Sequence, residues 1–218
     1  MSAWAKFAFE VLASTLAPDT CAACSQPVPM LTAFCRPCAA TLVRIPPDPD
    51  GTLAAFAYGG ALAEAITRFK YNSRPDLARP LSALLARTVL GLDPAPQVVT
   101  PVPLYPSRLV ERGYNQAALL ASCLARGFGA CFAPCALVRT RDTTQQAKLD
   151  RGGRMTNVAG AFEVRQRRRF VGRRVLLVDD VRTTGATLRA CALALRQAGA
   201  SEVQTAVLAL ADMGADHS

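Results

Sequence analysis

The segment at residues 175–187 constrains the fold more than any other part of this 218-residue chain. It reads Val-Leu-Leu-Val-Asp-Asp-Val-Arg-Thr-Thr-Gly-Ala-Thr. Its four leading apolar residues have the length and branching of a strand buried on both faces, as in a parallel sheet. Asp179 and Asp180 follow at the carboxyl end of this strand, where open α/β sheets bind ligands. The segment therefore predicts an α/β fold with a ligand site at this position.

The loop after the two acids has the composition of an anion site. Thr183, Thr184 and Thr187 offer hydroxyl donors, and Gly185 lets the backbone approach a ligand closely. The helix expected over residues 188–198 would direct its free N–H groups and its positive dipole end at a phosphate. The alternative is that these residues only cap a helix, but a cap needs one such residue and this segment supplies two acids and three threonines. We therefore predict a ribose-phosphate site.

The segment resembles the phosphoribosyl-pyrophosphate (PRPP) signature of type I phosphoribosyltransferases, which has four apolar residues, two acids, an apolar residue and a loop ending Thr-Gly-x-Thr. The resemblance implies that the two acids are catalytic and hold the ribose 2′- and 3′-hydroxyls, and that residues 182–187 wrap the 5′-phosphate. Mg²⁺ would bridge the pyrophosphate and the ribose hydroxyls near the acids, mostly through water and substrate oxygens. The expected PRPP-binding residues are Asp179, Asp180, Val181, Arg182, Thr183, Thr184, Gly185, Ala186 and Thr187.

Four cysteines near the N-terminus form the second signal. Cys21 and Cys24 make one Cys-x-x-Cys knuckle, and Cys35 and Cys38 make another after ten residues. Two such knuckles bring four thiolates within reach of one tetrahedral Zn²⁺, and a set without histidine indicates a closed, structural site. The alternatives are two disulfides or buried free thiols, but nothing suggests an oxidising compartment. The thiolates and the lack of a targeting signal favour the cytoplasm.

A proline-rich segment at residues 45–51 marks a domain boundary. We expect a small domain at residues 1–50, with a helix at 7–17 and the zinc module, and a larger domain at residues 51–218. No apolar run reaches the roughly 18 residues that span a bilayer, so membrane insertion is not expected. Helices alternate with strands in the larger domain, which implies a mainly parallel sheet flanked by helices. The expected helices are residues 61–70, 77–90, 117–126 and 188–198, and the expected strands are residues 98–104, 136–139, 160–164, 175–178 and 203–210.

Further motifs narrow the resemblance to one family. These motifs are Pro101-Val-Pro-Leu104, Arg108 with Arg112-Gly-Tyr-Asn-Gln116, Gln145-x-x-x-Leu149, Arg154-x-x-Asn157 and Gly160-Ala-Phe162. Together with the cysteine knuckles they look like the ComF family of phosphoribosyltransferase-like proteins, in order over nearly the whole chain. Tyr114 stands where the family commonly has Phe. The resemblance implies a type I phosphoribosyltransferase fold, a link to the handling of single-stranded DNA in competence, and a helicase-like ATPase partner.

Positive charge is concentrated in residues 139–174. This stretch holds eleven Lys and Arg against three Asp and Glu, a balance of +8 out of +9 for the chain. It could neutralise pyrophosphate, a nucleic-acid backbone, or both, and the alternative is a solvated face that aids solubility. Few aromatic residues lie nearby to stack bases, so sequence-specific readout is not expected. The candidates for nucleic-acid contact are Arg167, Arg168 and Arg169.

Two functions of different classes follow from these motifs. The first is a cytoplasmic phosphoribosyltransferase that acts on PRPP and an unknown acceptor, with Arg108 and Arg112, and more weakly Lys70, as candidates for pyrophosphate contact. The second is a non-enzymatic adaptor that senses PRPP or a nucleoside monophosphate, while its basic face and zinc module engage single-stranded DNA or a partner protein. The sequence does not separate them, because no segment identifies itself as a pocket for an acceptor base.

Overall fold

The computed structural model describes residues 20–29, 32–46, 48–141 and 160–211. Two expectations fall outside these residues. They are the helix at residues 7–17 and the part of the basic stretch that carries Lys148, Arg151 and Arg154, which also holds the motifs Gln145-x-x-x-Leu149 and Arg154-x-x-Asn157.

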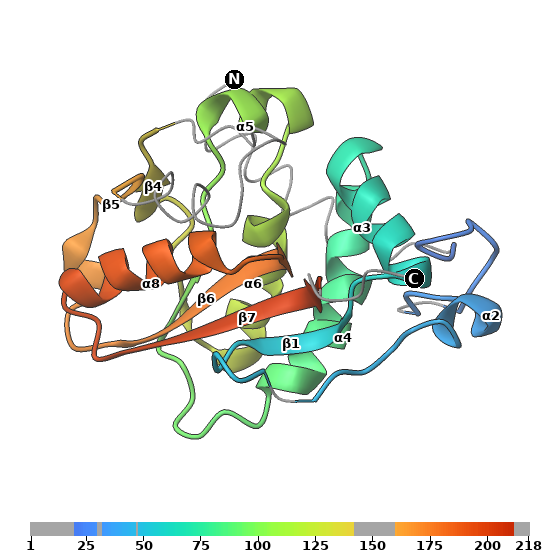
Figure 1. Ribbon diagram of the computed structural model, residues 1–218, viewed down its shortest axis with the longest axis horizontal. Coiled ribbons are helices and arrows are strands. Elements are labelled where there is room, and N and C mark those ends of the chain that lie inside the picture. Colours follow the sequence, from blue (N-terminus) through green and yellow to red (C-terminus); the bar gives the residue numbers. More distant parts are fainter. Residues whose placement is uncertain (1–19, 30–31, 47, 142–159, 212–218) are drawn as a thin grey trace.

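A parallel sheet forms the centre of the molecule (Figure 1). Within the described residues it has five strands in the order β1-β7-β6-β2-β3, and every neighbouring pair is parallel. The mainly parallel sheet expected from the alternation of strands and helices is therefore confirmed. The strands are β1 (Leu53–Ala57), β2 (Val98–Pro101), β3 (Cys131–Phe132), β6 (Arg174–Arg182) and β7 (Glu202–Leu210).

Strand β6 is buried on both faces, as its apolar run predicts. Leu176 and Val178 belong to one apolar cluster, and Val175 and Leu177 belong to the other. Because successive side chains of a strand point to opposite faces, the two clusters lie on either side of the sheet.

The strand also extends further than the apolar run. It continues to Arg182, so Asp179 and Asp180 lie within the strand rather than after it. Past Val178, β6 still pairs with β7 but no longer with β2, whose last partner is Pro101. The two acids therefore lie where the sheet has become narrower, beside the end of β2.

Helices cover both faces of this sheet. Helices α3, α4 and α6 pack on the face that carries Leu176, whereas α8 and an antiparallel hairpin pack on the face that carries Leu177. The four helices expected in residues 51–218 are confirmed to within two residues at each end. The longer helices are α3 (Gly60–Tyr71), α4 (Ala78–Val89), α6 (Gln116–Phe128) and α8 (Ala186–Gln197), and the hairpin is β4 (Leu137–Arg139) with β5 (Phe162–Val164). The short helical elements are α2 (Arg36–Ala39), η1 (Pro75–Leu77), α5 (Pro106–Arg112) and η2 (Arg167–Arg169).

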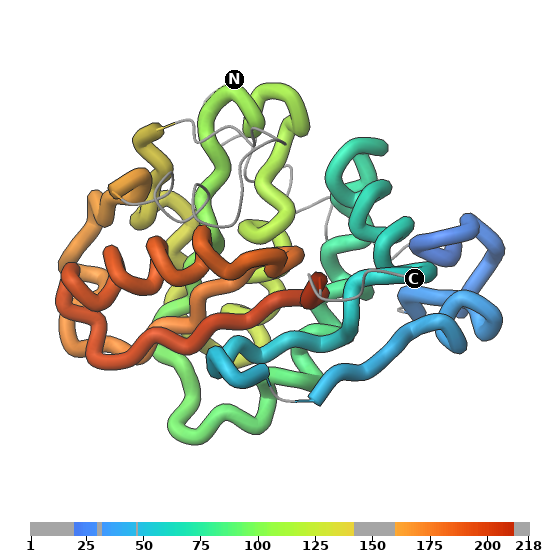
Figure 2. The backbone as a smooth tube through the Cα atoms, viewed as in Figure 1, coloured from blue at the N-terminus to red at the C-terminus, as the bar shows by residue number. Residues whose placement is uncertain are grey.

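The segment that carries the four cysteines packs against α3. Cys21 and Phe34 are buried in the same apolar cluster as Phe69 of α3. The Oγ1 atom of Thr41 accepts a hydrogen bond from the N–H of Ala61 at 3.0 Å, which satisfies a donor in the first turn of α3. The chain then runs from α2 to β1 (Figure 2). Since the two segments share one apolar cluster, a domain boundary at residue 50 stays a prediction.

Candidate functional site

The two acids of the signature point to opposite faces of the sheet. Asp180 lies on the α3 face, beside Lys70. Asp179 lies on the α8 face, where burial and the charge of Asp179 raise the pKa of the Cys191 thiol. Each carboxylate accepts a hydrogen bond from the next N–H, at 2.9 Å from Asp180 to Asp179 and at 2.8 Å from Val181 to Asp180. The pair therefore flanks the carboxyl end of β6 on both sides.

The environments of the two carboxylates differ. The Oδ2 atom of Asp180 is 2.8 Å from the Nζ atom of Lys70, and these side chains are only 10% and 20% exposed. Burial opposes the charge of Lys70, but the attraction of Asp180 outweighs it and raises the pKa of Lys70. Burial and the adjacent charge of Asp180 raise the pKa of Asp179 well above its ordinary value. A cation or a hydrogen-bond donor placed next to such a carboxylate stabilises its ionised form.

Arg112 joins this cluster from the C-terminal end of α5. Its guanidinium lies 4.9 Å from the centre of the Tyr71 ring and donates to Tyr71 Oη and Gln116 Oε1, both at 3.1 Å. Among the described residues, the buried Arg112 Nε and Gln116 Nε2 have no hydrogen-bond partner. Neighbouring unpaired donors indicate a place for an anionic or carbonyl group. Arg108, the other expected contact, instead pairs with Glu111 at 2.9 Å, with both side chains largely exposed.

The loop after β6 leads into a helix start that suits an anion. Gly185 is the N-cap of α8 and has a φ of 73°, a left-handed conformation that favours glycine. Glycine brings no capping side chain, and Thr184 Oγ1 accepts only a long hydrogen bond of 3.4 Å from Ala186. The remaining N–H groups of the first turn are the donors that anions use at helix N-termini.

The side chain of Arg182 lies beside Gly185 of this loop but is paired with acids outside the loop. It forms an ion pair with Asp48, and a second one with Asp50 at 3.0 Å, both in the segment that precedes β1. A contact between the Arg182 side chain and the 5′-phosphate therefore stays a prediction.

The four expected metal ligands converge on one point. The Sγ atoms of Cys21, Cys24, Cys35 and Cys38 all lie within 4.8 Å of one another, and the four residues are free thiols rather than two disulfides. Zinc–sulfur bonds of about 2.3 Å place neighbouring sulfurs of a tetrahedron about 3.8 Å apart, which matches this spacing. Burial disfavours the Cys21 thiolate, but backbone hydrogen bonds from Cys24 and Cys35 lower its pKa to about 6. The chain therefore has a tetracysteine metal-binding site whose donors fit zinc.

The arginine cluster consists of Arg167, Arg168 and Arg169 in η2. It lies at the other end of the sheet from the signature loop. Helix η2 directly precedes β6, which has nine residues and therefore spans about 26 Å before the loop begins. The cluster and the signature loop are therefore too far apart to contact one PRPP molecule together, and the partner of the cluster stays a prediction. Arg167 donates to the carbonyls of Ala198 and Gln197 at the end of α8, at 3.1 and 3.2 Å. Arg168 and Arg169 are exposed, and Arg169 also bonds Gln166.

Several participants were missed by reasoning from the sequence. Gln116 belongs to the Arg-Gly-Tyr-Asn-Gln motif, so its position was marked although its role was not. Tyr71 has no motif around it, and its place beside Arg112 depends on how α3 and α5 pack. Asp48 and Asp50 were noted only as part of the boundary segment, whereas the structure joins them to Arg182.

Comparisons with known proteins agree with this architecture. Residues 115–217 match the model of the phosphoribosyl transferase domain family. Competence protein F of Haemophilus influenzae is 32% identical over 197 residues, which cover 88% of this chain and 84% of that protein. DNA utilization protein YhgH of Escherichia coli is 34% identical over 174 residues, covering 77% and 75%. Competence protein ComFC of Bacillus subtilis is 29% identical over 185 residues, covering 82% and 72%.

Among the described residues, every helix is too short or too polar to span a bilayer. The relatives from Haemophilus influenzae and Escherichia coli are more than 30% identical to this chain and align over most of both chains. The chain therefore belongs to the ComF family of phosphoribosyltransferase-like competence proteins.

Proposed function

We propose that this protein binds PRPP at the carboxyl end of β6 and transfers its 5-phosphoribosyl group to an acceptor in the cytoplasm. The observation that carries the proposal is the position of Asp179 and Asp180 directly before the start of α8. The acids would hold the ribose hydroxyls, and the N–H groups and threonines of residues 183–187 would hold the 5′-phosphate. The names of the relatives support a role in competence or DNA use.

Each neighbouring side chain then has a defined task. Transfer breaks the bond between the ribose C1 atom and a pyrophosphate oxygen, so negative charge grows on the leaving group. Arg112 Nε and Gln116 Nε2, which are buried donors without a partner among the described residues, are suited to stabilise that charge. Lys70 holds Asp180 in position through their ion pair. Mg²⁺, for which carboxylate oxygens are suitable ligands, would supply further neutralisation of the pyrophosphate when bound.

Zinc would have a structural task in this protein. Its four thiolate ligands would leave no open position for water, so we assign it no step of the reaction. The tetracysteine segment packs on α3, the helix that provides Lys70, so the metal would stabilise one wall of the site.

Isothermal titration calorimetry with PRPP and Mg²⁺ tests the binding step. The double variant Asp179→Asn/Asp180→Asn should lose at least roughly ten-fold in affinity, because charged acceptors for the ribose hydroxyls are removed. Thr184→Val should weaken binding by about 1 to 3 kcal/mol. Glu163→Gln/Glu202→Gln is the matched control, since it removes the same charge from exposed positions elsewhere. Unchanged affinity in the double Asn variant would contradict the assignment.

The distance between the signature loop and the arginine cluster favours a second candidate function. A ligand at the signature loop leaves the arginine cluster accessible, because β6 separates them by about 26 Å. The protein would then be an adaptor that senses PRPP or a nucleoside monophosphate while it holds single-stranded DNA and a helicase-like ATPase. A screen of PRPP with a panel of bases, read out as pyrophosphate release, separates the two functions. Turnover with one acceptor supports the enzyme, and tight PRPP binding without turnover supports the adaptor.

A further inference from the structure

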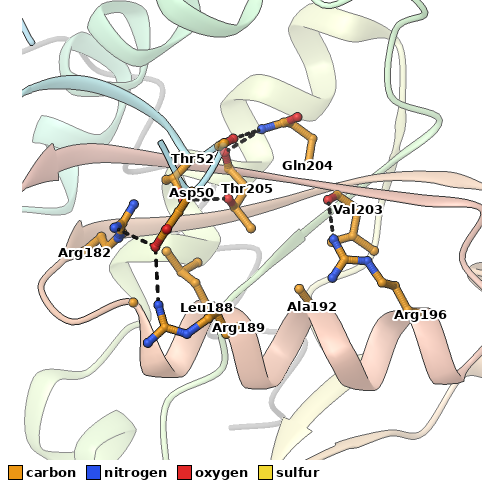
Figure 3. Close-up of a pocket in the computed structure, with 12 residues that line it drawn as sticks. Asp50, Thr52, Arg182, Leu188, Arg189, Ala192, Arg196, Val203, Gln204 and Thr205 are labelled. Carbon is orange, nitrogen blue, oxygen red and sulfur yellow. Dashed lines mark hydrogen bonds and ion pairs between the residues drawn. The ribbon is translucent and has the colours of Figure 1, made fainter. Parts of the chain in front are cut away.

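A pocket of about 530 Å³ lies between α8 and β7 (Figure 3). It is on the α8 face of the sheet, opposite the face where Lys70 meets Asp180. Arg182 and Arg189 bound one end and Arg196 bounds the other. Leu188, Ala192 and Val203 supply an apolar wall, and Thr52, Gln204 and Thr205 supply a polar one.

Two guanidinium groups converge at one end of this pocket. A Cβ atom built on Gly185 would lie 2.8 Å from Arg189 Nη1 and 3.1 Å from Arg182 Nε, so both cations occupy the space that a side chain would fill. Like charges this close together require an anion between them. Asp50 is that anion, because its Oδ2 atom lies 3.0 Å from Arg182 and 3.5 Å from Arg189 (Figure 3).

The carboxylate of Asp50 is held weakly. Its side chain is 53% exposed and that of Arg189 is 49% exposed, and exposed ion pairs contribute little to stability. Asp48, in contrast, is buried against Arg182 and has a side chain only 6% exposed. Within the described part of the chain, the buried Arg182 Nε has no hydrogen-bond partner. An external anion can therefore replace Asp50 while Asp48 stays in place.

We propose that this pocket binds a nucleotide-sized phosphate ester whose phosphate replaces Asp50 between Arg182 and Arg189. Three arginines, Asp48 and Asp50 leave a local charge of +1, which favours an anionic ligand such as a phosphate ester. The volume lies within the range of small-molecule sites. The rest of the ligand packs on the apolar wall, and Thr205 and Gln204 offer hydrogen bonds. This site lies behind the predicted PRPP loop, and Arg182 and Gly185 belong to both, so a ligand here can act as an effector of that loop.

Calorimetry with adenosine 5′-monophosphate, in buffer without added Mg²⁺, tests this site. Asp50→Asn should bind the nucleotide about two- to five-fold more tightly, because a weak internal competitor is removed. Arg189→Ser should bind it at least roughly ten-fold more weakly, because a charge-assisted contact is lost. Arg173→Ser is the matched control, since it removes an exposed arginine next to the start of β6, at the other end of the sheet. Adenosine and inorganic phosphate should each bind more weakly than the nucleotide, because each makes only half of the contacts.

Asp180→Asn separates this site from the ribose site. It should leave nucleotide affinity in this buffer within about two-fold of the wild type, whereas it weakens Mg²⁺-dependent PRPP binding. Arg189→Ser should do the reverse, and thermal unfolding checks that each variant is folded. The proposal is overturned if millimolar nucleotide binds neither the wild type nor Asp50→Asn. It is also overturned if Arg189→Ser and Arg173→Ser have the same effect, or if Asp180→Asn abolishes nucleotide binding.

Discussion

At the scale of single residues, Asp179 and Asp180 are neighbours with opposite effects on stability. The negative charge of Asp180 is compensated by Lys70, whose Nζ atom lies 2.8 Å from Asp180 Oδ2. Asp179 has a pKa well above its ordinary value because of burial and the charge of Asp180. A raised pKa in the folded state means that the stabilising contribution is complete below the pKa of the unfolded chain and is lost as the pH rises through the folded value. Ionised Asp179 therefore destabilises the folded protein at neutral pH.

Substituting each acid separately tests this difference. We expect Asp179→Asn to raise the free energy of unfolding at pH 8, and the gain to disappear below pH ~3, where the carboxyl is protonated in both states. Asp180→Asn should lower the free energy of unfolding by about 1 to 3 kcal/mol, because Lys70 loses its partner in a largely buried position. Urea denaturation of the two variants at pH 8 is the measurement. Changes of the same sign in both variants would show that the two environments are alike.

The sequence predicted the two acids but not their separation across the sheet. The apolar run at residues 175–178 indicated a strand, yet its carboxyl end could not be placed, because the pairing of residues 179–182 depends on β7. Lys70 was a weak candidate for pyrophosphate, and its partner turned out to be Asp180. Contacts of this kind depend on how α3 packs, and no local pattern encodes that.

At the scale of elements, α6 begins at a position that also fixes the end of β2. Asn115 is its N-cap, and its side chain accepts a hydrogen bond from the N–H of Ala118 at 3.3 Å. The same side chain donates to the carbonyl of Val102 at 3.0 Å. Asn115→Ala should therefore lower the free energy of unfolding by about 1 to 2 kcal/mol in chemical denaturation. Asn115→Asp is the control: it keeps the cap but not the donor, so it should fall between the wild type and Asn115→Ala.

The tetracysteine segment should depend on its metal. Structural zinc contributes folding free energy on the order of 10 kcal/mol in small modules. Cys21→Ser or Cys38→Ser should therefore abolish the bound zinc and expose the backbone before Pro46 to hydrogen exchange. Cys123→Ser is the control, because Cys123 lies on α6, away from the four ligands. Metal analysis that finds no zinc in the wild type, with the four thiols reduced, would contradict the prediction.

The elements that escaped prediction are short or interrupted. Strand β1 has the sequence Leu-Ala-Ala-Phe-Ala, which lacks both alternation and β-branched residues, and it is specified by pairing with β7. Strand β3 has two residues and gains its place only through β2. Helix α5 begins at a proline and has no buried residues, so it carries no periodic apolar signal. The expected strand at 98–104 ends at Pro101, although the N–H of Val102 still donates to the carbonyl of Val178 in β6 at 2.8 Å.

At the scale of the whole molecule, the two acids and the arginine cluster lie at opposite ends of the sheet. The acids and the phosphate loop lie at the carboxyl end of β6, and the arginine cluster lies at its amino end. The local charge balance of +8 was visible in the sequence, but its distance from the loop was not. With PRPP at the proposed position, that distance leaves nucleic acid or solvent as the partner of the cluster.

The three arginines of η2 are all exposed but differ in their hydrogen bonds, which leads to the last prediction. Arg167 is committed to the carbonyls that end α8, so Arg167→Ser should lower stability by about 1 kcal/mol and leave nucleic-acid binding nearly unchanged. Arg168 and Arg169 are exposed, and each phosphate that they neutralise adds about 0.7 to the negative slope of log affinity against log salt. Arg168→Ser/Arg169→Ser should therefore flatten that slope by up to about 1.4 on a labelled single-stranded oligonucleotide, with little dependence on its sequence. Zinc content should not change. Salt titrations of the wild type, this double variant and Arg167→Ser decide the matter, because superimposable curves for the first two would assign the cluster to solvent.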